Sequence, residues 1–340
     1  MNLTHCRALA AVVSLLAGTA AGIHAAGRLT IYFIDVEGGQ STLVVTPAGQ
    51  SLLVDAGYAD PPGRDLRRIQ AALQDAGVTR IDDLLLTHFH ADHVGGVPAL
   101  VKSVEIDAVI DHDGITGSDR QTAQPFNALM PARKKIKKHI VAAVGDRLPL
   151  DGVDAVVVSS AGATLKQPLD GAGETNAACG PSARPPHDVV ENPRSTGFRL
   201  QFGKFRFLDL GDLSGKPLFA LVCPADMIGA VDLYLVPHHG NDDVIDPALL
   251  AAFRPRADIV NNGATKGGAP ELITALQKAG GLESWQLHRA ENRDAVNLAD
   301  DRIANLDERS AHWIKVVASE DGSFTVTNGR TGATRPFPGR

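Results

Sequence analysis

Aromatic residues make up only 5% of this chain, and its 33 Lys and Arg are outnumbered by 39 Asp and Glu, for a net charge of −6. An acidic balance argues against general attraction to nucleic acid, because phosphate groups need cationic partners. The aromatic residues do not interleave with the strongest basic run, so the sequence does not support a base-stacking surface. No apolar run reaches the roughly 20 residues of a membrane-spanning helix.

The N-terminus carries a short apolar stretch, residues 8–22, behind Arg7. Small residues follow, with Ile23 and Ala25 at the −3 and −1 positions of a cleavage site, so residues 1–25 are predicted to be a secretory signal. An uncleaved anchor is the alternative. Cleavage removes one basic residue, so 33 become 32 against 39 acidic residues and the net charge moves from −6 to −7. The mature chain is expected to be periplasmic or secreted, with no stable membrane association.

The mature chain would keep two cysteines, Cys179 and Cys223, because Cys6 lies in the predicted signal. In an oxidising compartment these two can form a disulfide. Two free buried thiols are the alternative, since spacing along the chain does not give their separation in space.

Short β-branched or apolar runs alternate with helical patterns, which indicates an α/β fold. The expected strands are 29–35, 42–46, 51–55, 81–88, 108–110, two around 147–159, 196–202, 205–210, 231–236 and 257–261. The expected helices are 64–76, one from Val94 past Leu100, 122–142 with an interruption at Pro131, 247–253 and 270–279. Residues 161–194 are rich in Gly, Pro, Ala and Asn and predict a long surface loop, and residues 313–328 predict a hairpin.

The most specific feature is Thr-His-Phe-His-Ala-Asp-His at residues 87–93, directly after the apolar run 84–86. In extended chain, residues two apart point the same way, so His88 and His90 can reach one metal ion. After a turn, Asp92 and His93 can face a second ion. Imidazole and carboxylate ligands suit zinc first, with manganese or iron as alternatives. The competing interpretation is a polar loop with surface histidines.

Three further segments place a carboxylate or imidazole at the end of a predicted strand: Asp55 ahead of Gly57, Asp212 after strand 205–210, and His238-His239 after strand 231–236. In this order, the residues resemble those of the metallo-β-lactamase superfamily. The resemblance covers about residues 28–290. It implies a four-layer αββα sandwich with a two-metal site along one edge of the paired sheets.

Within the superfamily, the chain most resembles the hydrolase domain of ComEC-type competence proteins. The segments that carry this likeness are Ile34-Asp35-Val36, Gly38-Gly39-Gln40, Leu53 through Gly57, Asn192 with Ser195, Phe207 through Asp212, and Val236 through Gly240. The chain is therefore expected to consist of a signal at 1–25, a hydrolase domain at 26–290 and a C-terminal extension with a hairpin at 291–340.

The resemblance also implies roles for the site residues. His88 and His90 would bind the first ion, Asp92 and His93 the second, and Asp212 both. One member of the 238–239 pair would complete the second site, with His238 favoured because it is nearer the strand end. The predicted metal ligands are His88, His90, Asp92, His93, Asp212, His238 and His239, of which Asp92, His238 and His239 are also expected to be catalytic. Asp55 would support a ligand histidine through a hydrogen bond, or only form a turn before Gly57.

The sequence departs from the family pattern just before strand 196–202, where many members place a third histidine for the first ion. Asn192 stands there and could coordinate weakly, while His187 could swing in from the loop or remain an exposed loop residue. His288 could enter the pocket from the far end of the chain, or be a solvated or capping histidine. Ala269 replaces the histidine of a His-Pro pair in the ComEC-type pattern, which weakens a direct transfer of nuclease activity.

One basic run stands out, at residues 133–138. On the expected helix, Arg133, Lys134, Lys137 and Lys138 would share a face. That face would contact phosphate or another anion, or would be only a solvated surface.

These features predict an exported dinuclear metal hydrolase in which a metal-bound hydroxide attacks a phosphodiester or other phosphoester. The substrate would be a small or short phosphoester, and not a long nucleic acid. The alternatives are a lactone, carboxylic ester or amide hydrolase of the same fold, and a protein that binds metal and ligand without turnover. The sequence leaves the oligomeric state open.

Overall fold

The computed structural model describes residues 27–60, 63–117, 119–180 and 187–340. The predicted signal at 1–25 lies outside these ranges, so its cleavage stays a prediction. Within them, no helix is both long enough and apolar enough to cross a membrane.

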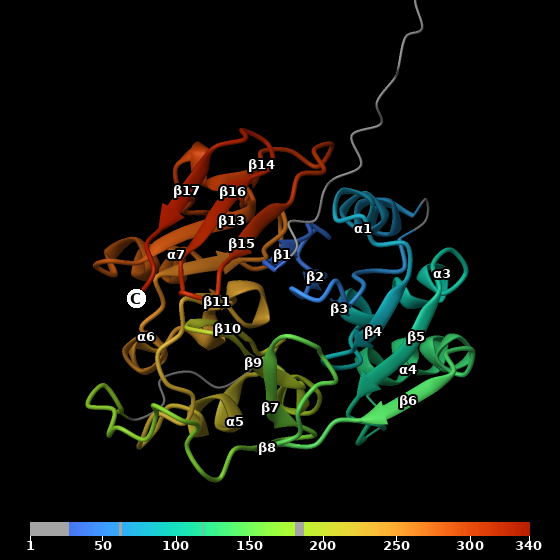
Figure 1. Ribbon diagram of the computed structural model, residues 1–340, viewed down its shortest axis with the longest axis horizontal. Helices are drawn as coiled ribbons and strands as arrows, with labels where there is room; N and C mark the ends of the chain where they lie inside the picture. Colours follow the sequence, from blue (N-terminus) through green and yellow to red (C-terminus); the bar gives the residue numbers. More distant parts are fainter. Residues whose placement is uncertain (1–26, 61–62, 118, 181–186) are drawn as a thin grey trace, which may run out of the picture.

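In the described ranges, nine strands form a first sheet in the order β17-β16-β15-β1-β2-β3-β4-β5-β6 (Figure 1). Their bounds are β1 Leu29–Phe33, β2 Thr42–Val45, β3 Ser51–Val54, β4 Ile81–Leu85, β5 Ile106–Asp111, β6 Lys138–Val141, β15 Ile314–Ala318, β16 Phe324–Asn328 and β17 Thr334–Phe337. The antiparallel meander β1–β2–β3 continues into the parallel strands β3 to β6. On the other side of β1, the predicted hairpin β15–β16 extends the same sheet.

Eight strands of the described chain form a second sheet in the order β14-β13-β12-β11-β10-β9-β7-β8. Their bounds are β7 Asp154–Ser160, β8 Ala163–Thr164, β9 Gly197–Phe202, β10 Phe205–Asp209, β11 Leu233–Leu235, β12 Ala257–Val260, β13 Glu283–His288 and β14 Ile303–Asn305. Strands β10 to β14 are parallel. Residues 291–340 therefore supply one strand to this sheet and three strands to the first.

The α-helices are α1 Arg64–Asp75, α2 Ala91–Val94, α3 Val97–Leu100, α4 Arg120–Arg133, α5 Gly215–Ala220, α6 Pro247–Phe253 and α7 Pro270–Lys278. Short 3₁₀ turns occur at η1 Asn192–Arg194, η2 His238–Gly240, η3 Asp242–Val244 and η4 Asp300–Arg302. Asp119 and Asp246 begin α4 and α6 by accepting hydrogen bonds from Thr122 and Ala248 backbone N–H groups.

The hydrophobic residues form three clusters that define four layers. Alternate residues of a strand face opposite sides of its sheet, so Ile31 packs between the two sheets while its neighbour Tyr32 lies on the outer face and donates a hydrogen bond to Asp75 of α1. A third cluster joins the outer face of the second sheet to α5, α6 and α7. This arrangement confirms the predicted αββα sandwich.

The prediction of a helix over 122–142 is wrong in its second half. Helix α4 continues through Pro131 but ends at Arg133, and the chain then enters β6, which pairs in parallel with β5. Pairing along an open sheet edge outweighs the helical pattern here. Arg133 and Lys138 therefore lie on different elements, and the basic run does not form one helix face.

The long loop 161–194 is tied to the segment after α5 by a disulfide. The sulfur atoms of Cys179 and Cys223 are bonded, and their Cα atoms lie 5.8 Å apart. This settles the choice that the sequence left open between a pair and two free thiols.

Candidate metal centre

The predicted metal ligands lie where strands of both sheets end. Parallel strands present their carboxyl ends at one edge of a sheet, which is where α/β folds place their ligands. In the first sheet, Asp55 directly follows β3, and His88 follows β4 after two intervening residues. In the second sheet, Asp212 follows β10 and His238 follows β11. Contacts between these residues show that the two edges meet.

Four buried residues lie together where the second metal ion is predicted. The ligand atoms of Asp92, His93, Asp212 and His239 all lie within 4.8 Å of one another. His239 Nε2 is 3.1 Å from both Asp92 Oδ2 and Asp212 Oδ2, and His93 Nε2 is 3.2 Å from Asp212 Oδ2. His239, not His238, completes this group, so the preference for His238 is wrong.

His238 instead faces the first predicted position. Its Nε2 is 3.9 Å from Asp212 Oδ2, and His88 Nε2 is 3.8 Å from that same oxygen. His90 Nδ1 lies 3.0 Å from His88 Nε2. His238 is therefore a candidate for the place of the third histidine that the sequence lacks before β9.

The backbone explains why two consecutive histidines serve different positions. His238 and His239 have φ angles of 51° and 56°, a left-handed conformation that non-glycine residues rarely adopt. The neighbouring Gly240 also has positive φ. With this tight turn, His239 Nε2 lies 3.1 Å from Asp212 Oδ2 and His238 Nε2 lies 3.9 Å from it, a difference that a simple strand-end rule does not predict.

Two carboxylates orient the ligand histidines from behind. Asp55 Oδ2 is 2.6 Å from His93 Nδ1, and Asp55 also accepts hydrogen bonds from the backbone N–H and hydroxyl of Thr87. Asp243 Oδ1 is 2.8 Å from His238 Nδ1. Each pair holds Nδ1 and leaves Nε2 to face the centre, as carboxylate–histidine pairs do at metal sites.

The surroundings shift the pKa values of Asp212 and His88 in the site. Burial alone opposes ionisation of Asp212, but the imidazoles of His239 and His93 hold the pKa of its carboxyl well below the usual value. Burial, together with His93 and His90, lowers the pKa of His88 well below its usual value. A neutral His88 can offer its lone pair to a cation.

The donor set fits divalent cations. His93 Nε2 and His239 Nε2 are 3.3 Å apart, so two imidazole nitrogens face each other in the same space as two carboxylates. Asp212 Oδ1 is buried and accepts no hydrogen bond from the described residues. Buried nitrogen and oxygen acceptors that converge in this way match the ligand chemistry of zinc, manganese and iron.

The centre opens into a mouth, a cavity of about 420 Å³. It is lined by His90, Ala91, Asp92, Gln121, His187, Asp188, Asn192, Asp212, His238 and Lys266. The side-chain nitrogen Nδ2 of Asn192 lies 3.1 Å from Nε2 of His238. His187 is exposed and contacts the Asp242 carboxylate, so it lies at the rim and not among the ligands.

His288 does not join the metal centre. It is buried at the end of β13, where its Nε2 is 3.7 Å from Glu37 Oε2 and its Nδ1 is 2.8 Å from the Arg289 carbonyl. Arg68 bridges Glu37 and Asp35 beside it, so these residues form a separate ion-pair cluster.

Lys266 is a site residue that the sequence did not reveal. Its ammonium contacts the Asp92 carboxylate and lies 3.5 Å from the Tyr58 hydroxyl. It comes from a glycine-rich loop with no periodicity. A Cβ at Gly39 would meet the Asp92 carbonyl oxygen at 2.3 Å, and one at Gly263 would meet the Glu37 backbone at 2.4 Å. The glycines therefore mark where two loops close around Asp92 and Lys266.

Comparison with known families agrees with this architecture. Residues 34–160 match the family described as the metallo-beta-lactamase superfamily. The chain therefore contains a metallo-beta-lactamase superfamily domain. The residues of the centre that follow β10 and β11 lie outside the matched segment but within the same fold.

Short segments also resemble individual proteins. The chain is 36% identical over 77 residues to an atrochrysone carboxyl ACP thioesterase from Aspergillus terreus, covering 23% of this chain and 21% of the relative. It is 37% identical over 76 residues to a ribonuclease Z from Bradyrhizobium, covering 22% and 23%. The match thus spans about a fifth of either relative. The solved structure of Zn²⁺-bound PqqB from Methylobacterium extorquens gives a TM-score of 0.45 at 16% identity, over 76% of this chain and 97% of that one.

Proposed function

We propose that this protein is a hydrolase that uses two divalent metal ions. The observation that carries the proposal is that one buried oxygen, Asp212 Oδ2, lies 3.1 to 3.9 Å from an imidazole nitrogen of each of four histidines. His88, His90 and His238 would hold the first ion, Asp92, His93 and His239 the second, and Asp212 both. Bound ions of this kind lower the pKa of water and stabilise the charge that develops on the attacked group. Zinc is our first choice of metal, with manganese or iron as alternatives.

The protein's own residues prepare this site. Asp55 and Asp243 fix the rings of His93 and His238, so the ligands are oriented before substrate arrives. Among the described residues that line the mouth, Lys266 supplies the single Lys or Arg side chain. It can hold an anionic group of the substrate, or the negative oxygen that forms during the attack of water.

The charge near the mouth leads us to place a carboxylic ester or thioester ahead of a phosphoester. Gln121 reaches the mouth from the start of α4, whereas Arg133 ends that helix about 18 Å away at 1.5 Å per residue. Arg133 is also paired with Asp111 and Asp113. The basic run that favoured a polyanionic substrate therefore does not reach a group at the metal centre, and the likeness to a thioesterase agrees with an ester.

A small phosphodiester is the second candidate. Lys266 could neutralise one phosphate charge, and the ribonuclease Z likeness supports this reading. A long nucleic acid has few cationic partners here, because the mouth also presents the carboxylate of Asp188.

We also propose that the protein works outside the cytoplasm, in the periplasm or as a secreted protein. The Cys179–Cys223 disulfide supports this location, because such bonds persist in oxidising compartments. It is consistent with the predicted signal at 1–25.

The test is a substrate panel with purified, metal-loaded protein, comparing p-nitrophenyl esters, an acyl thioester, a lactone, bis-p-nitrophenyl phosphate and single-stranded DNA. Asp212→Ala should lose both bound metal, measured by elemental analysis, and turnover, while Asp151→Ala on the exposed surface should keep both. Full metal occupancy without turnover of any substrate would favour a binding protein. Failure to bind metal under loading conditions would reject the proposal.

A further inference from the structure

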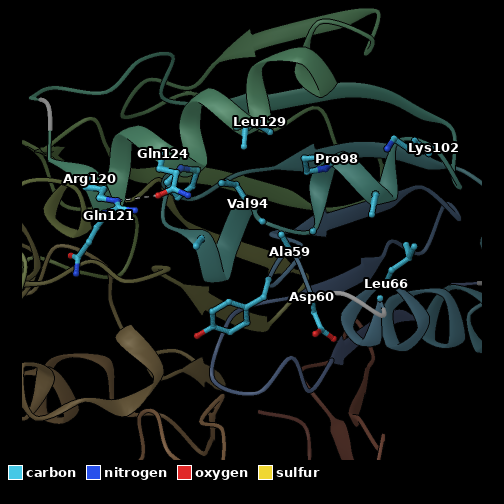
Figure 2. Close-up of a pocket in the computed structure, with 18 residues that line it drawn as sticks. Ala59, Asp60, Leu66, Val94, Pro98, Lys102, Arg120, Gln121, Gln124 and Leu129 are labelled. Carbon is cyan, nitrogen blue, oxygen red and sulfur yellow. Dashed lines mark hydrogen bonds between the residues drawn. The ribbon is translucent and has the colours of Figure 1, made fainter.

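A second and larger cavity, of about 870 Å³, lies beside the mouth and is not explained by metal binding (Figure 2). It is lined by residues 58–60 and 63 ahead of α1, the start of α1, and helices α2, α3 and α4. Figure 2 shows Val94, Pro98 and Leu129 on one side of it and Leu66 of α1 across from them. Its volume falls in the range of sites that bind small molecules, about 300 to 1,000 Å³.

The lining of this cavity is mainly apolar. Ala59, Leu66, Val94, Pro98, Ala128 and Leu129 contribute to it. The charged residues of the lining are Asp60, Lys102 and Arg120, which together carry a net charge of only +1. A polyanion would gain little here, whereas an apolar group would leave water and gain free energy in proportion to the area that it buries.

The cavity adjoins the mouth of the metal centre. Ala91 and Gln121 line both spaces. Tyr58 lines the large cavity, and its hydroxyl lies 3.5 Å from Lys266 Nζ, which lines the mouth. A molecule with its reacting group at the mouth can therefore extend an apolar chain into the larger space.

We propose that this cavity binds the apolar acyl group of an ester or thioester whose carbonyl carbon lies at the metal centre. The proposal rests on the hydrolase function and narrows its substrate class. In the reaction, water adds across the acyl bond: the acyl carbon takes the hydroxyl group, and the departing alcohol or thiol takes the proton. The carboxylic acid that remains keeps its chain in the cavity until release.

The experiment varies acyl length with a constant leaving group, from p-nitrophenyl acetate to p-nitrophenyl decanoate. Each buried CH₂ group contributes about 0.8 kcal/mol, so kcat/KM should rise about fourfold per CH₂ until the cavity is full. Ala128→Trp, at an exposed α4 position that lines the cavity, should lower the decanoate-to-acetate ratio of kcat/KM at least tenfold. Gln124→Trp, one turn earlier, is the second variant, and circular dichroism checks the fold of both.

Asn127→Trp is the matched control, because residue 127 is exposed on the same helix but does not line the cavity. It should keep the wild-type dependence on chain length. Binding of decanoate to the metal-free protein, measured by calorimetry, supplies a readout that does not depend on turnover. Wild type and Asn127→Trp should bind decanoate more tightly than butyrate, and Ala128→Trp should lose this preference.

The two proposals can fail separately. If esters are hydrolysed with no dependence on acyl length, or if Ala128→Trp and Asn127→Trp behave alike in both assays, the acyl-site proposal is overturned. If decanoate binds with the expected preference but no substrate of the panel, ester or phosphoester, is hydrolysed, the hydrolase proposal fails while the assignment of the cavity to an apolar chain stands.

Discussion

Breaking the Cys179–Cys223 bond should destabilise the protein strongly. The bond joins positions 44 residues apart in sequence and anchors the loop that carries Asp188 and Asn192 to the mouth. Replacing both cysteines by serine removes the cross-link and adds one hydroxyl at each position.

The size of the effect follows from the length of the closed loop. In the chain-entropy description, a cross-link over 44 residues removes about 13 cal/mol/K from the unfolded ensemble, which corresponds to about 4 kcal/mol at 25 °C. Domains are typically stable by about 5 to 15 kcal/mol, so this is a large share. The loss comes from the unfolded state, which becomes freer when the bond is absent.

Urea unfolding, followed by circular dichroism, measures the difference. The oxidised wild type should unfold at a higher urea concentration than the double serine variant, with a free-energy difference near 4 kcal/mol. Reductant should bring the wild type close to the variant and should leave the variant itself unchanged. Equal stability of the oxidised wild type and the variant would refute the reasoning, as would a wild type that does not respond to reductant.

Four further outcomes are expected. Asp55→Asn should weaken metal binding 10- to 100-fold in a chelator competition, because the ring of His93 loses its anionic partner; unchanged affinity would assign Asp55 only to a turn. Burial, opposed by the Ser284 hydroxyl, raises the pKa of Asp258 to about 8, so the folded state holds a proton that the unfolded chain releases above its ordinary pKa of 3.8. The protonated Asp258 therefore adds to the free energy of unfolding at low pH, and this stabilisation is lost as pH rises between about 4 and 8, at up to about 1.4 kcal/mol per pH unit. Asp258→Asn should flatten the measured dependence of the unfolding free energy on pH, and parallel curves for variant and wild type would contradict this. Lys266→Met should raise KM for a substrate with an anionic group more than for a neutral ester, and an equal effect on both would argue against a charge contact. N-terminal sequencing of exported protein should begin near Ala26, and a start at Met1 would favour an anchor.

Local spacing carried most of the metal-site prediction. Residues 87–93 hold four of the candidate ligands, and their order after a buried strand constrains their geometry before any tertiary contact forms. Asp55 and Asp212 were found by the same rule, because each follows a strand whose carboxyl end reaches the common edge. The contacts between Asp212 and the histidines confirm that these separate segments converge.

What the sequence missed depends on backbone detail and long-range contact. The exchange of roles between His238 and His239 depends on the positive φ angles of these two residues, which the sequence pattern does not predict. Lys266 and Asp243 lie in irregular segments and gain their roles only from what the fold places beside them. The helix expected through residue 142 stopped at Arg133 because β5 offers β6 a partner that a local pattern does not contain.

The position of β1 inside the first sheet has a consequence for biosynthesis. This strand, the first one after the predicted signal, pairs with β2 on one side and with β15, almost at the other end of the chain, on the other. While the ribosome is still making the protein, one whole row of its backbone hydrogen-bonding groups has no partner. The first sheet therefore cannot close until residues 314–318 have emerged. If the protein is exported as proposed, this late closure would keep the nascent chain unfolded until it reaches a membrane translocation channel, which is the condition that passage in an unfolded form requires.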